Sequence, residues 1–235
     1  FVKIGIFCGG IALCGILLGG MALALAWPNL PDLHAMTDYR PRVPLRIYTN
    51  DHVLIGEFGE ERRNVLGFDE IPDVMKSAVL AAEDDRFYEH GGIDWMGVAR
   101  AGLTNLVNMS KSQGASTITM QVARNFYLSS EKTYSRKFYE LLLTFKIESE
   151  LTKNQILELY MNQIYLGHRA YGFAAASRTY FGKPLSEVTA AEAAMLAGIP
   201  KAPSRFNPIA NFKRSEFRQD YVLGRMHSLG FLTDD

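Results

Sequence analysis

The sequence predicts a mainly α-helical domain that is preceded by a small β-hairpin and an N-terminal transmembrane helix. Three observations lead to this fold class. Residues 4–27 contain no charged side chain, apolar residues recur every three or four positions from residue 71 onward, and residues 46–58 combine two β-rich halves around a turn. The chain has 235 residues, which is enough for one sizeable domain and an anchor, or for two small domains.

The first element is the uncharged stretch of residues 4–27. At ~1.5 Å rise per residue, a helix of this length is about 36 Å long and can cross a hydrocarbon core of ~30 Å with some tilt. A cleavable signal peptide has a shorter apolar region of ~7–15 residues, so a membrane anchor is the favoured interpretation. Lys3 indicates that the N-terminal side faces the cytoplasm. Both cysteines, Cys8 and Cys14, lie in this segment, so the rest of the chain has no disulfide framework or thiolate metal site.

A proline-punctuated linker and the hairpin follow the anchor, and together they fill residues 28–67. The strands of the hairpin flank Asn50 and Asp51, which favour turns. From residue 68 onward the apolar periodicity is helical. Helices are predicted over residues 71–88, 94–109, 117–128, 133–151, 152–164, 170–181, from 189, and over 212–229.

Local signals at the helix ends support these elements. Pro72 stands near the first turn of the first helix, and Asp94 is a typical N-cap for the second. The helices at residues 152 and 189 open with the capping boxes Thr-x-x-Gln and Thr-x-x-Glu. Gly182, followed closely by a proline, ends the helix that begins at residue 170.

The composition excludes several functional classes. The 25 basic and 25 acidic residues cancel, so nothing indicates a nucleic-acid partner. The five histidines have no metal-ligand spacing, and no phosphate-binding or dinucleotide-binding glycine loop is present. Ser129 and Lys132 match the Ser-x-x-Lys of penicillin-reactive enzymes, but neither Ser-Asp-Asn nor Lys-Thr-Gly follows, so we attribute the match to chance.

A first cluster of polar residues, Glu83-Asp84-Asp85-Arg86, follows an apolar helix. Glu83 lies at the border of the apolar stripe, where partial burial is expected to raise its pKa toward the range of a general base. Taken alone, this pattern is more often a solvated helix end with local ion pairs.

Two further clusters lie on later helices. Thr117, Gln121 and Arg124 are spaced so that they share one helix face. Arg136 and Glu140 are one turn apart, a spacing that commonly gives an ion pair on an exposed helix. Each pattern by itself is typical of a solvated amphipathic helix.

The clusters are more specific together than each is alone, because they belong to five motifs that follow one another between residues 83 and 208, within a resemblance that covers residues 45–210. The motifs are Glu83-Asp84-x-x-Phe87-x-x-His90-x-Gly92, Gly114-Ala-Ser-Thr-Ile-Thr-Met-Gln121, Arg136-Lys137-x-x-Glu140, Ile156-Leu-Glu-x-Tyr160-x-Asn162, and Ala197-Gly-x-Pro-Lys201-Ala-Pro-Ser followed by Asn207-Pro208. In this order they resemble the glycosyltransferase family 51 domain of class A, bifunctional penicillin-binding proteins. The resemblance implies a lysozyme-like fold over residues 68–210, with a helix in residues 211–235 that leads toward an absent second domain.

The resemblance also implies a reaction and a set of site residues. The reaction is the polymerisation of lipid II into β-1,4-linked glycan strands by an inverting general-base mechanism, with release of undecaprenyl pyrophosphate. Glu83 and Glu140 are implied as catalytic residues, Glu83 as the base. Glu140 either orients Arg136 or holds a divalent cation, Mg²⁺ or Mn²⁺, and no organic cofactor is implied. The implied substrate-binding residues are Asp84, Phe87, His90, Thr117, Gln121, Arg124, Asn125, Arg136 and Lys201.

One position departs from the family pattern, because Met120 stands where a glutamine is usual. We expect Met120 to turn toward packing. The expected partners are lipid II, the growing glycan strand, the bilayer, a transpeptidase domain C-terminal to this chain and other cell-wall synthesis proteins. The expected location is the bacterial inner membrane, crossed once, with the catalytic domain on the periplasmic or extracellular side.

Two other functions remain open from the sequence. A monofunctional transglycosylase performs the same chemistry without a second domain. A lysozyme-like peptidoglycan hydrolase is also mainly helical and uses one glutamate on the same polymer, but it needs no basic groups for a pyrophosphate.

Overall fold

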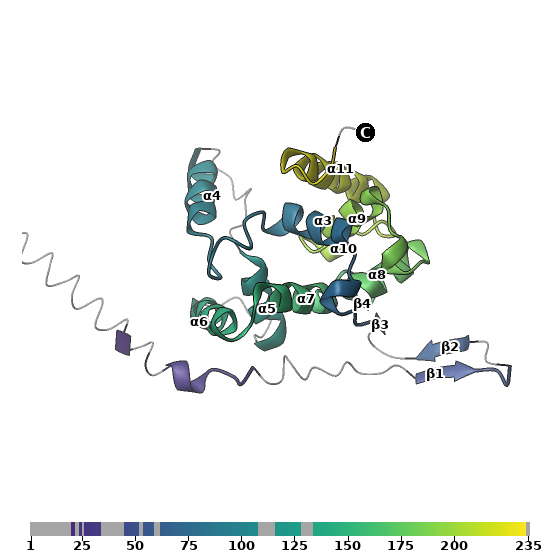
Figure 1. The fold of residues 1–235 in the computed structure, drawn as a ribbon, viewed down its shortest axis with the longest axis horizontal. Coiled ribbons are helices and arrows are strands. Elements are labelled where there is room, and N and C mark those ends of the chain that lie inside the picture. The colour runs from purple at the N-terminus through teal and green to yellow at the C-terminus, as the bar shows by residue number, and fades with distance from the viewer. Residues whose placement is uncertain are drawn as a thin grey trace, which may run out of the picture.

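The computed structural model describes residues 20–21, 24, 26–33, 45–51, 54–58, 62–107, 116–127 and 134–233. Helices dominate these residues, and the strands are few and short, so the predicted mainly α-helical fold is confirmed (Figure 1). Most of the predicted anchor, residues 4–27, lies outside the described residues. Within the described part of the chain, no helix has both the length and the apolar character needed to cross a membrane.

The segment ahead of the hairpin is joined to the helical domain. A short 3₁₀ helix, η1, covers Trp27–Asn29. Ala26, Leu30 and Leu33 are buried as part of the hydrophobic core, and Lys146 Nζ donates a hydrogen bond of 2.9 Å to the Pro31 carbonyl oxygen. Residues 26–33 therefore pack against the domain.

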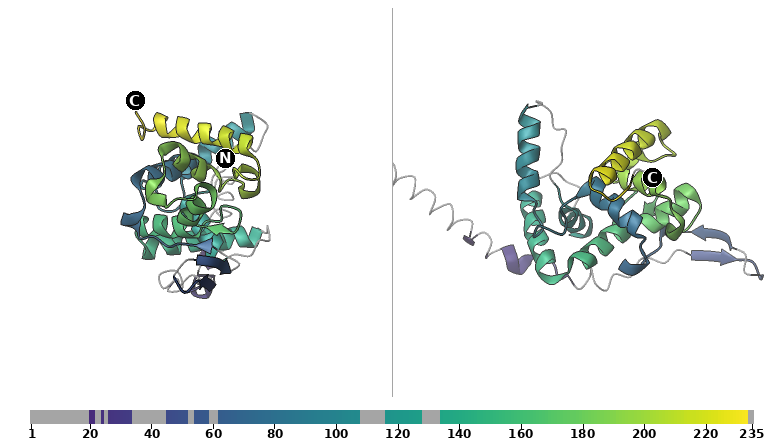
Figure 2. Two further views of the ribbon diagram at one scale, coloured as in Figure 1. Left: turned by 90° about the vertical axis from the view of Figure 1, so that its right-hand side faces the viewer. Right: turned by 45° about the horizontal axis from the view of Figure 1, so that its top comes forward.

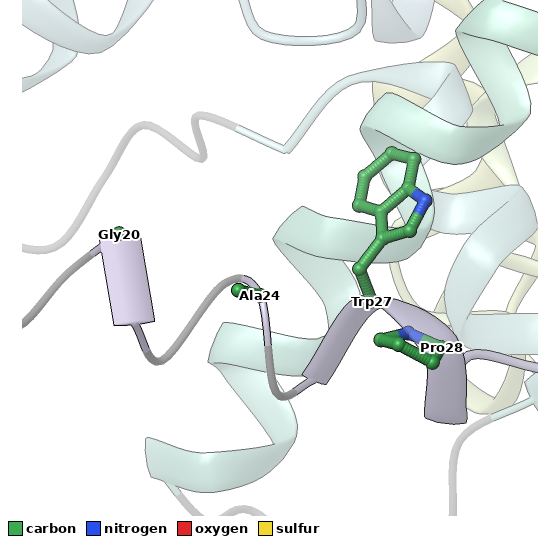
Figure 3. Close-up of a pocket in the computed structure, with 4 residues that line it drawn as sticks. All are labelled: Gly20, Ala24, Trp27 and Pro28. Atoms are coloured by element: carbon green, nitrogen blue, oxygen red, sulfur yellow. The ribbon is translucent and has the colours of Figure 1, made fainter.

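A hollow of about 470 Å³ adjoins the same segment (Figure 3). It is lined by Gly20, Ala24, Trp27 and Pro28. None of these residues belongs to the predicted site, and the hollow has no group that could act as an acid, base or cation. We therefore place the functional site elsewhere.

The predicted hairpin is confirmed. Strands β1 (Leu45–Tyr48) and β2 (Leu54–Phe58) pair antiparallel, with Leu45 opposite Phe58. A second pair was not predicted, since β3 (Arg62–Arg63) pairs in parallel with β4 (Ala170–Tyr171). The prediction of a helix from residue 170 is wrong in its first three residues: 170–171 form β4, and the helix begins after Gly172.

The longer helices agree with the predicted ones to within a few residues, except at the end of the first. They are α3 (Asp73–Glu83), α4 (Trp95–Val107), α5 (Ile118–Tyr127), α6 (Tyr134–Glu150), α7 (Lys153–Gln163), α8 (Phe173–Phe181), α9 (Ala190–Gly198) and α11 (Phe212–Ser228). Three short helices were not predicted: η2 (Phe68–Glu70), η3 (Leu185–Glu187) and α10 (Pro203–Phe206). Helix α3 was predicted to reach residue 88 but ends at Glu83, because Asp84 adopts an extended backbone with φ −160°.

Capping explains where several helices begin. Thr152 accepts a hydrogen bond from the Gln155 amide while the Gln155 side chain accepts one from the Thr152 amide, so this predicted capping box is confirmed. The box at Thr189 is confirmed in the same way. Asp94 accepts a hydrogen bond of 2.9 Å from the Gly97 amide, as expected for the N-cap of α4.

The helices form two groups around a common core. Helices α3, α9 and α11 pack on one another, and α5 packs on α6 and α7. In Figure 1 and the left view of Figure 2, α3 and α9 lie between α11 on one side and α5 and α7 on the other. Val222 and Met226 of α11 are buried in the same core as the residues of α3 and α9. The predicted domain limit at residue 210 therefore does not separate α11 from the core.

The start of α8 gives a stability prediction. Gly172 has φ +81°, ψ 157°, a region almost restricted to glycine, and an added Cβ would lie 2.6 Å from the Asn162 carbonyl oxygen. Gly182, at the other end of α8, has φ +71° with nothing within 4 Å of an added Cβ. We expect Gly172→Ala to cost about 2 kcal/mol and Gly182→Ala about 1 kcal/mol in urea unfolding. Equal losses would show that the close approach to Asn162 is not limiting.

Candidate functional site

Glu83 is the last residue of α3, and its side chain is half-buried at the boundary between the two helix groups. Gln121 of α5 donates a hydrogen bond of 2.8 Å from Nε2 to Glu83 Oε2. Burial raises the pKa of Glu83, although the Gln121 hydrogen bond and the positive charges of Arg218 and Lys201 act in the opposite direction. The expectation that partial burial raises this pKa is confirmed. A carboxylate with a raised pKa is a stronger proton acceptor than an exposed glutamate.

Asp84 has a different role from its neighbour. It is buried, and its carboxylate contacts His90 Nε2 at 3.0 and 3.2 Å and accepts a hydrogen bond of 3.1 Å from the Ile118 amide. Ile118 is the first residue of α5, so a negative charge lies at the positive end of that helix. Asp84 thereby ties the end of α3 to the start of α5, which sets Gln121 relative to Glu83.

Two further predicted substrate-binding residues lie within the same connection. Thr117 is buried, donates a hydrogen bond of 2.6 Å to the Gly92 carbonyl oxygen and accepts one of 3.2 Å from the Met120 amide. Phe87 is fully buried, with Lys153 Nζ 4.4 Å from its ring centroid. Their contacts in the structure are internal, and their contact with a substrate stays a prediction. Met120 is buried, as expected.

Glu140 of α6 is the centre of a second charged group. Its side chain is 0% exposed and accepts hydrogen bonds from Arg124 Nε at 3.3 Å and Arg124 Nη2 at 3.2 Å. Arg136 Nη1 lies 3.4 Å from Glu140 Oε2, so the ion pair expected from their spacing is present. Lys137 Nζ also hydrogen-bonds Glu140. Burial alone would raise the pKa of Glu140, but the hydrogen bonds and charges of Arg124 and Lys137 bring it below its usual value.

This group, Glu140 with Arg124, Arg136 and Lys137, is called the cation cluster. Three positive charges share one carboxylate, so the cation cluster carries a net charge of about +2 at neutral pH. The side chains of Arg124 and Lys137 keep contact with solvent, whereas Glu140 has none. The arrangement can therefore bind an anion through its guanidinium and ammonium groups, with Glu140 holding them in place.

The fully buried position of Glu140 bears on the roles implied for it. A catalytic residue has to reach the reacting atoms, but both carboxylate oxygens of Glu140 accept hydrogen bonds from cationic side chains. In the structure Glu140 holds Arg124, Arg136 and Lys137, and its implied role as a catalytic residue stays a prediction. Those same contacts do not suit a divalent cation, which would have to compete with three positive groups. Nor does any group of three or more His, Cys, Asp or Glu side chains with metal-binding geometry occur among the residues the structure describes.

The structure brings most of the charged candidates together. Gln121 and Arg124 lie three residues apart on α5, one bonded to Glu83 and the other to Glu140, so α5 connects Glu83 to the cation cluster. Lys201 is exposed in the turn after α9 and acts on Glu83 through its charge. Asn125 is exposed on α5. The groove expected to join these groups stays a prediction.

Two residues near the site were not predicted as site residues. Lys137 stands three residues before Glu140, and this helical spacing was a signal that could have identified it. Arg218 lies on α11, which was assigned to a region outside the domain, and a single arginine in that helix has no sequence pattern that points to Glu83.

Comparisons with known proteins identify the family of the chain. Residues 51–227 match the family described as Transglycosylase. The chain is 53% identical over 224 residues to penicillin-binding protein 1A of Neisseria flavescens, an alignment that covers 95% of this chain and 28% of that protein. It is 55% identical over 216 residues to a Cupriavidus necator protein that is named only provisionally as a transglycosylase, covering 92% of this chain and 84% of that protein.

A solved structure is also similar. The crystal structure of penicillin-binding protein 1A from Haemophilus influenzae matches 83% of this chain and 19% of its own chain, with 31% sequence identity and a TM-score of 0.47. The chain spans less than a third of the length of the penicillin-binding proteins 1A that it matches.

Proposed function

Because the chain belongs to the transglycosylase family, we propose that it is a peptidoglycan glycosyltransferase that polymerises lipid II into β-1,4-linked glycan strands and releases undecaprenyl pyrophosphate. The observation that carries the proposal is the link through α5 between a base and a cation cluster. Gln121 bonds Glu83, and Arg124, one turn later, bonds Glu140.

Glu83 acts as the general base in this proposal. The 4-hydroxyl of the acceptor is a poor nucleophile, so its proton has to leave as the oxygen attacks the anomeric carbon of the donor. The Glu83 carboxylate takes that proton, and its pKa, raised by burial, makes it a better acceptor than an exposed glutamate. Direct displacement at the anomeric carbon converts the α-linked donor into a β-linked product.

The cation cluster acts on the leaving group. Negative charge grows on the pyrophosphate as the glycosidic bond breaks, and donors fixed in advance stabilise that charge best. Arg124, Arg136 and Lys137 are held in advance by Glu140. Guanidinium groups match phosphate oxygens in geometry, so Arg124 is suited to contact the pyrophosphate directly.

The proposal extends to the membrane. Both substrates carry undecaprenyl chains, and an enzyme held at the same leaflet searches a surface instead of a volume. Residues 4–27 would supply the anchor, with the domain on the outer side of the inner membrane. Trp95, Met96 and Val98 at the start of α4 expose apolar side chains, which favours contact of that helix with the bilayer.

The proposal includes a transpeptidase domain C-terminal to this region. It is supported by the relatives named penicillin-binding protein 1A, which are more than three times as long as the region they share with this chain. The monofunctional alternative is supported by the Cupriavidus necator protein, since the alignment covers 84% of that protein. The chemistry at Glu83 is the same in both cases.

Labelled lipid II tests the proposed reaction. The purified chain in detergent should convert it into strands that grow with time, both with a divalent cation and with a chelator, because the cation cluster already supplies the positive charge. Growth that requires the cation would assign Glu140 a metal after all. Release of soluble fragments from finished peptidoglycan, without growth from lipid II, would instead support the lysozyme-like hydrolase.

A further inference from the structure

Glu148 lies on α6, about two helical turns after Glu140. Its side chain is 12% exposed, and its Oε1 atom accepts a hydrogen bond of 2.5 Å from Thr119 Oγ1 and one of 2.8 Å from Lys153 Nζ. Thr119 belongs to α5, and Lys153 is the first residue of α7. One carboxylate oxygen of α6 therefore bonds both α5 and α7, and the three helices pack on one another.

Three consecutive residues at the start of α5 hold that helix from two directions. The Thr117 hydroxyl and the Ile118 amide both bond the segment between α3 and α4. The fully buried Thr119 hydroxyl bonds Glu148 of α6 instead. Contacts from two directions fix the position of a helix and also its rotation about its own axis. Thr119 and Glu148 therefore supply the polar contact that ties the first turn of α5 to α6.

The side chain of Glu148 also lies against the segment between α3 and α4. A Cβ on Gly92 would lie 2.6 Å from Thr144 Cγ2 and 3.0 Å from Glu148 Cγ, so the backbone of Gly92 lies directly against α6. Lys153, which Glu148 holds, lies 4.4 Å from the ring centroid of the fully buried Phe87 in the same segment. Glu148 thus contacts both the start of α5 and the connection to which α5 is bonded.

Small shifts of α5 matter because this helix carries two residues of the site. Gln121, two residues after Thr119, donates its hydrogen bond of 2.8 Å to Glu83. Arg124 follows about one turn later and bonds Glu140. In the proposed reaction Glu83 acts on the acceptor and the cation cluster acts on the leaving group, so α5 spans the distance between the two. A misplacement of ~1 Å in such an arrangement can lower the rate by about 10²-fold.

We propose that Glu148 is a positioning residue of the transfer reaction: by bonding Thr119, it fixes α5 in the orientation that presents Gln121 to the base. This inference rests on the proposed function, because it assumes that Glu83 and the cation cluster act in one reaction. Glu148 works through α5 and does not touch the reacting atoms. An ion pair between Glu148 and Lys153 with a merely structural role would change the stability of the protein, but not the kcat of its folded form.

Steady-state kinetics of lipid II polymerisation by the purified chain in detergent test this role. Glu148→Ala should lower kcat by about 10²-fold with little change in KM, because α5 loses its orientation while the substrate-binding groups remain. Glu148→Gln keeps an oxygen acceptor for the Thr119 hydroxyl and should retain most of kcat. Glu150→Ala removes an exposed carboxylate of the same helix and should leave kcat unchanged.

Two substitutions of Thr119 separate the hydrogen bond from the packing. Thr119→Val keeps nearly the same shape but cannot donate to Glu148, so it should lower kcat on the order of tenfold, less than Glu148→Ala because Lys153 still holds the carboxylate. Thr119→Ser keeps the donor and should retain most of kcat. Unchanged kcat in both Glu148→Ala and Thr119→Val overturns the inference, whether or not urea unfolding shows a loss of stability.

The side-chain amide of Gln121 gives a second measurement that needs no activity. In ¹⁵N-labelled protein its signal, assigned by its loss in Gln121→Leu, reports the hydrogen bond to Glu83. Glu148→Ala and Thr119→Val should move this signal, and Thr119→Ser should not; if Glu148→Ala does not fold, the two Thr119 variants answer the same question. A fall in kcat with an unmoved signal overturns the inference. A moved signal, in a chain that does not polymerise lipid II even without substitutions, supports the contact that orients α5 and refutes the proposed function.

Discussion

Glu83→Gln should lower kcat for strand growth by about 10²–10⁴-fold, the usual contribution of a general base. Glutamine keeps the size of the side chain, but it cannot take a proton from the acceptor hydroxyl. Activity of the unchanged protein should also fall as the pH drops through the raised pKa of Glu83, because only the ionised carboxylate is a base. Both effects are measured as initial rates of strand growth across pH, with Glu216→Gln, an exposed change on α11, as the control.

The same variant should be at least as stable as the unchanged protein at neutral pH. The folded pKa of Glu83 lies above its ordinary value because burial penalises the charged form, so the protein gains stability as the pH falls through that pKa. Glutamine removes this charge and its pH dependence together. Thermal unfolding at several pH values measures both. A variant that polymerises lipid II at the normal rate would remove Glu83 from the mechanism.

Glu140→Gln should reduce both activity and stability. The variant leaves Arg124, Arg136 and Lys137 close together without their shared anion, so their positions at the leaving group are lost. Breaking a buried ion pair typically costs 3–5 kcal/mol, and the exposure of Arg124 and Lys137 places this case near the lower end, on the order of 3 kcal/mol. Urea unfolding measures the loss, and Glu150→Gln, exposed on the same helix, serves as the control.

The pH dependence of Glu140 has the opposite sign to that of Glu83. Its folded pKa lies below the ordinary value, so its stabilisation is fully present above the unfolded pKa of about 4.3 and is lost as the pH falls through the folded value. The unchanged protein should therefore lose this contribution in acid, while Glu140→Gln should not. Equal acid sensitivity of the two proteins would show that the cation cluster is not linked to Glu140 as the geometry indicates.

The parts of the fold that were predicted correctly depend on local signals. The capping boxes at Thr152 and Thr189, the N-cap Asp94 and the hairpin around Asn50 each involve residues close in sequence. The pairing of β3 with β4 joins segments that are more than 100 residues apart and only two residues long, so no periodicity could indicate it. Helix α3 was predicted to end too late, because the apolar periodicity of the helix does not reveal the extended backbone of Asp84.

In the functional site, too, the local sequence patterns were predicted correctly, and the contacts between distant segments were not. The order of the motifs identified Glu83, Gln121, Arg124, Arg136 and Glu140. In the structure they form two bonded groups, Glu83 with Gln121 and Glu140 with Arg124 and Arg136, which helix α5 links. The roles of Asp84 and Thr117 required the structure, because a buried polar residue in a motif can serve the helix ends as well as a ligand. The position of Arg218 could not be predicted, because it depends on how α11 packs on α3 and α9.

Residues 26–33 pack against the domain, so they are the first contact that a mechanical pull on the preceding chain would reach. Lys146, which holds the Pro31 carbonyl, lies on α6 less than two turns after Glu140, and Leu30 and Leu33 are buried in the core. A slack tether would absorb a pull on the chain ahead of residue 26. In this protein such a pull would meet the docked segment first, and that segment is bonded through Lys146 to α6, the helix that carries Glu140.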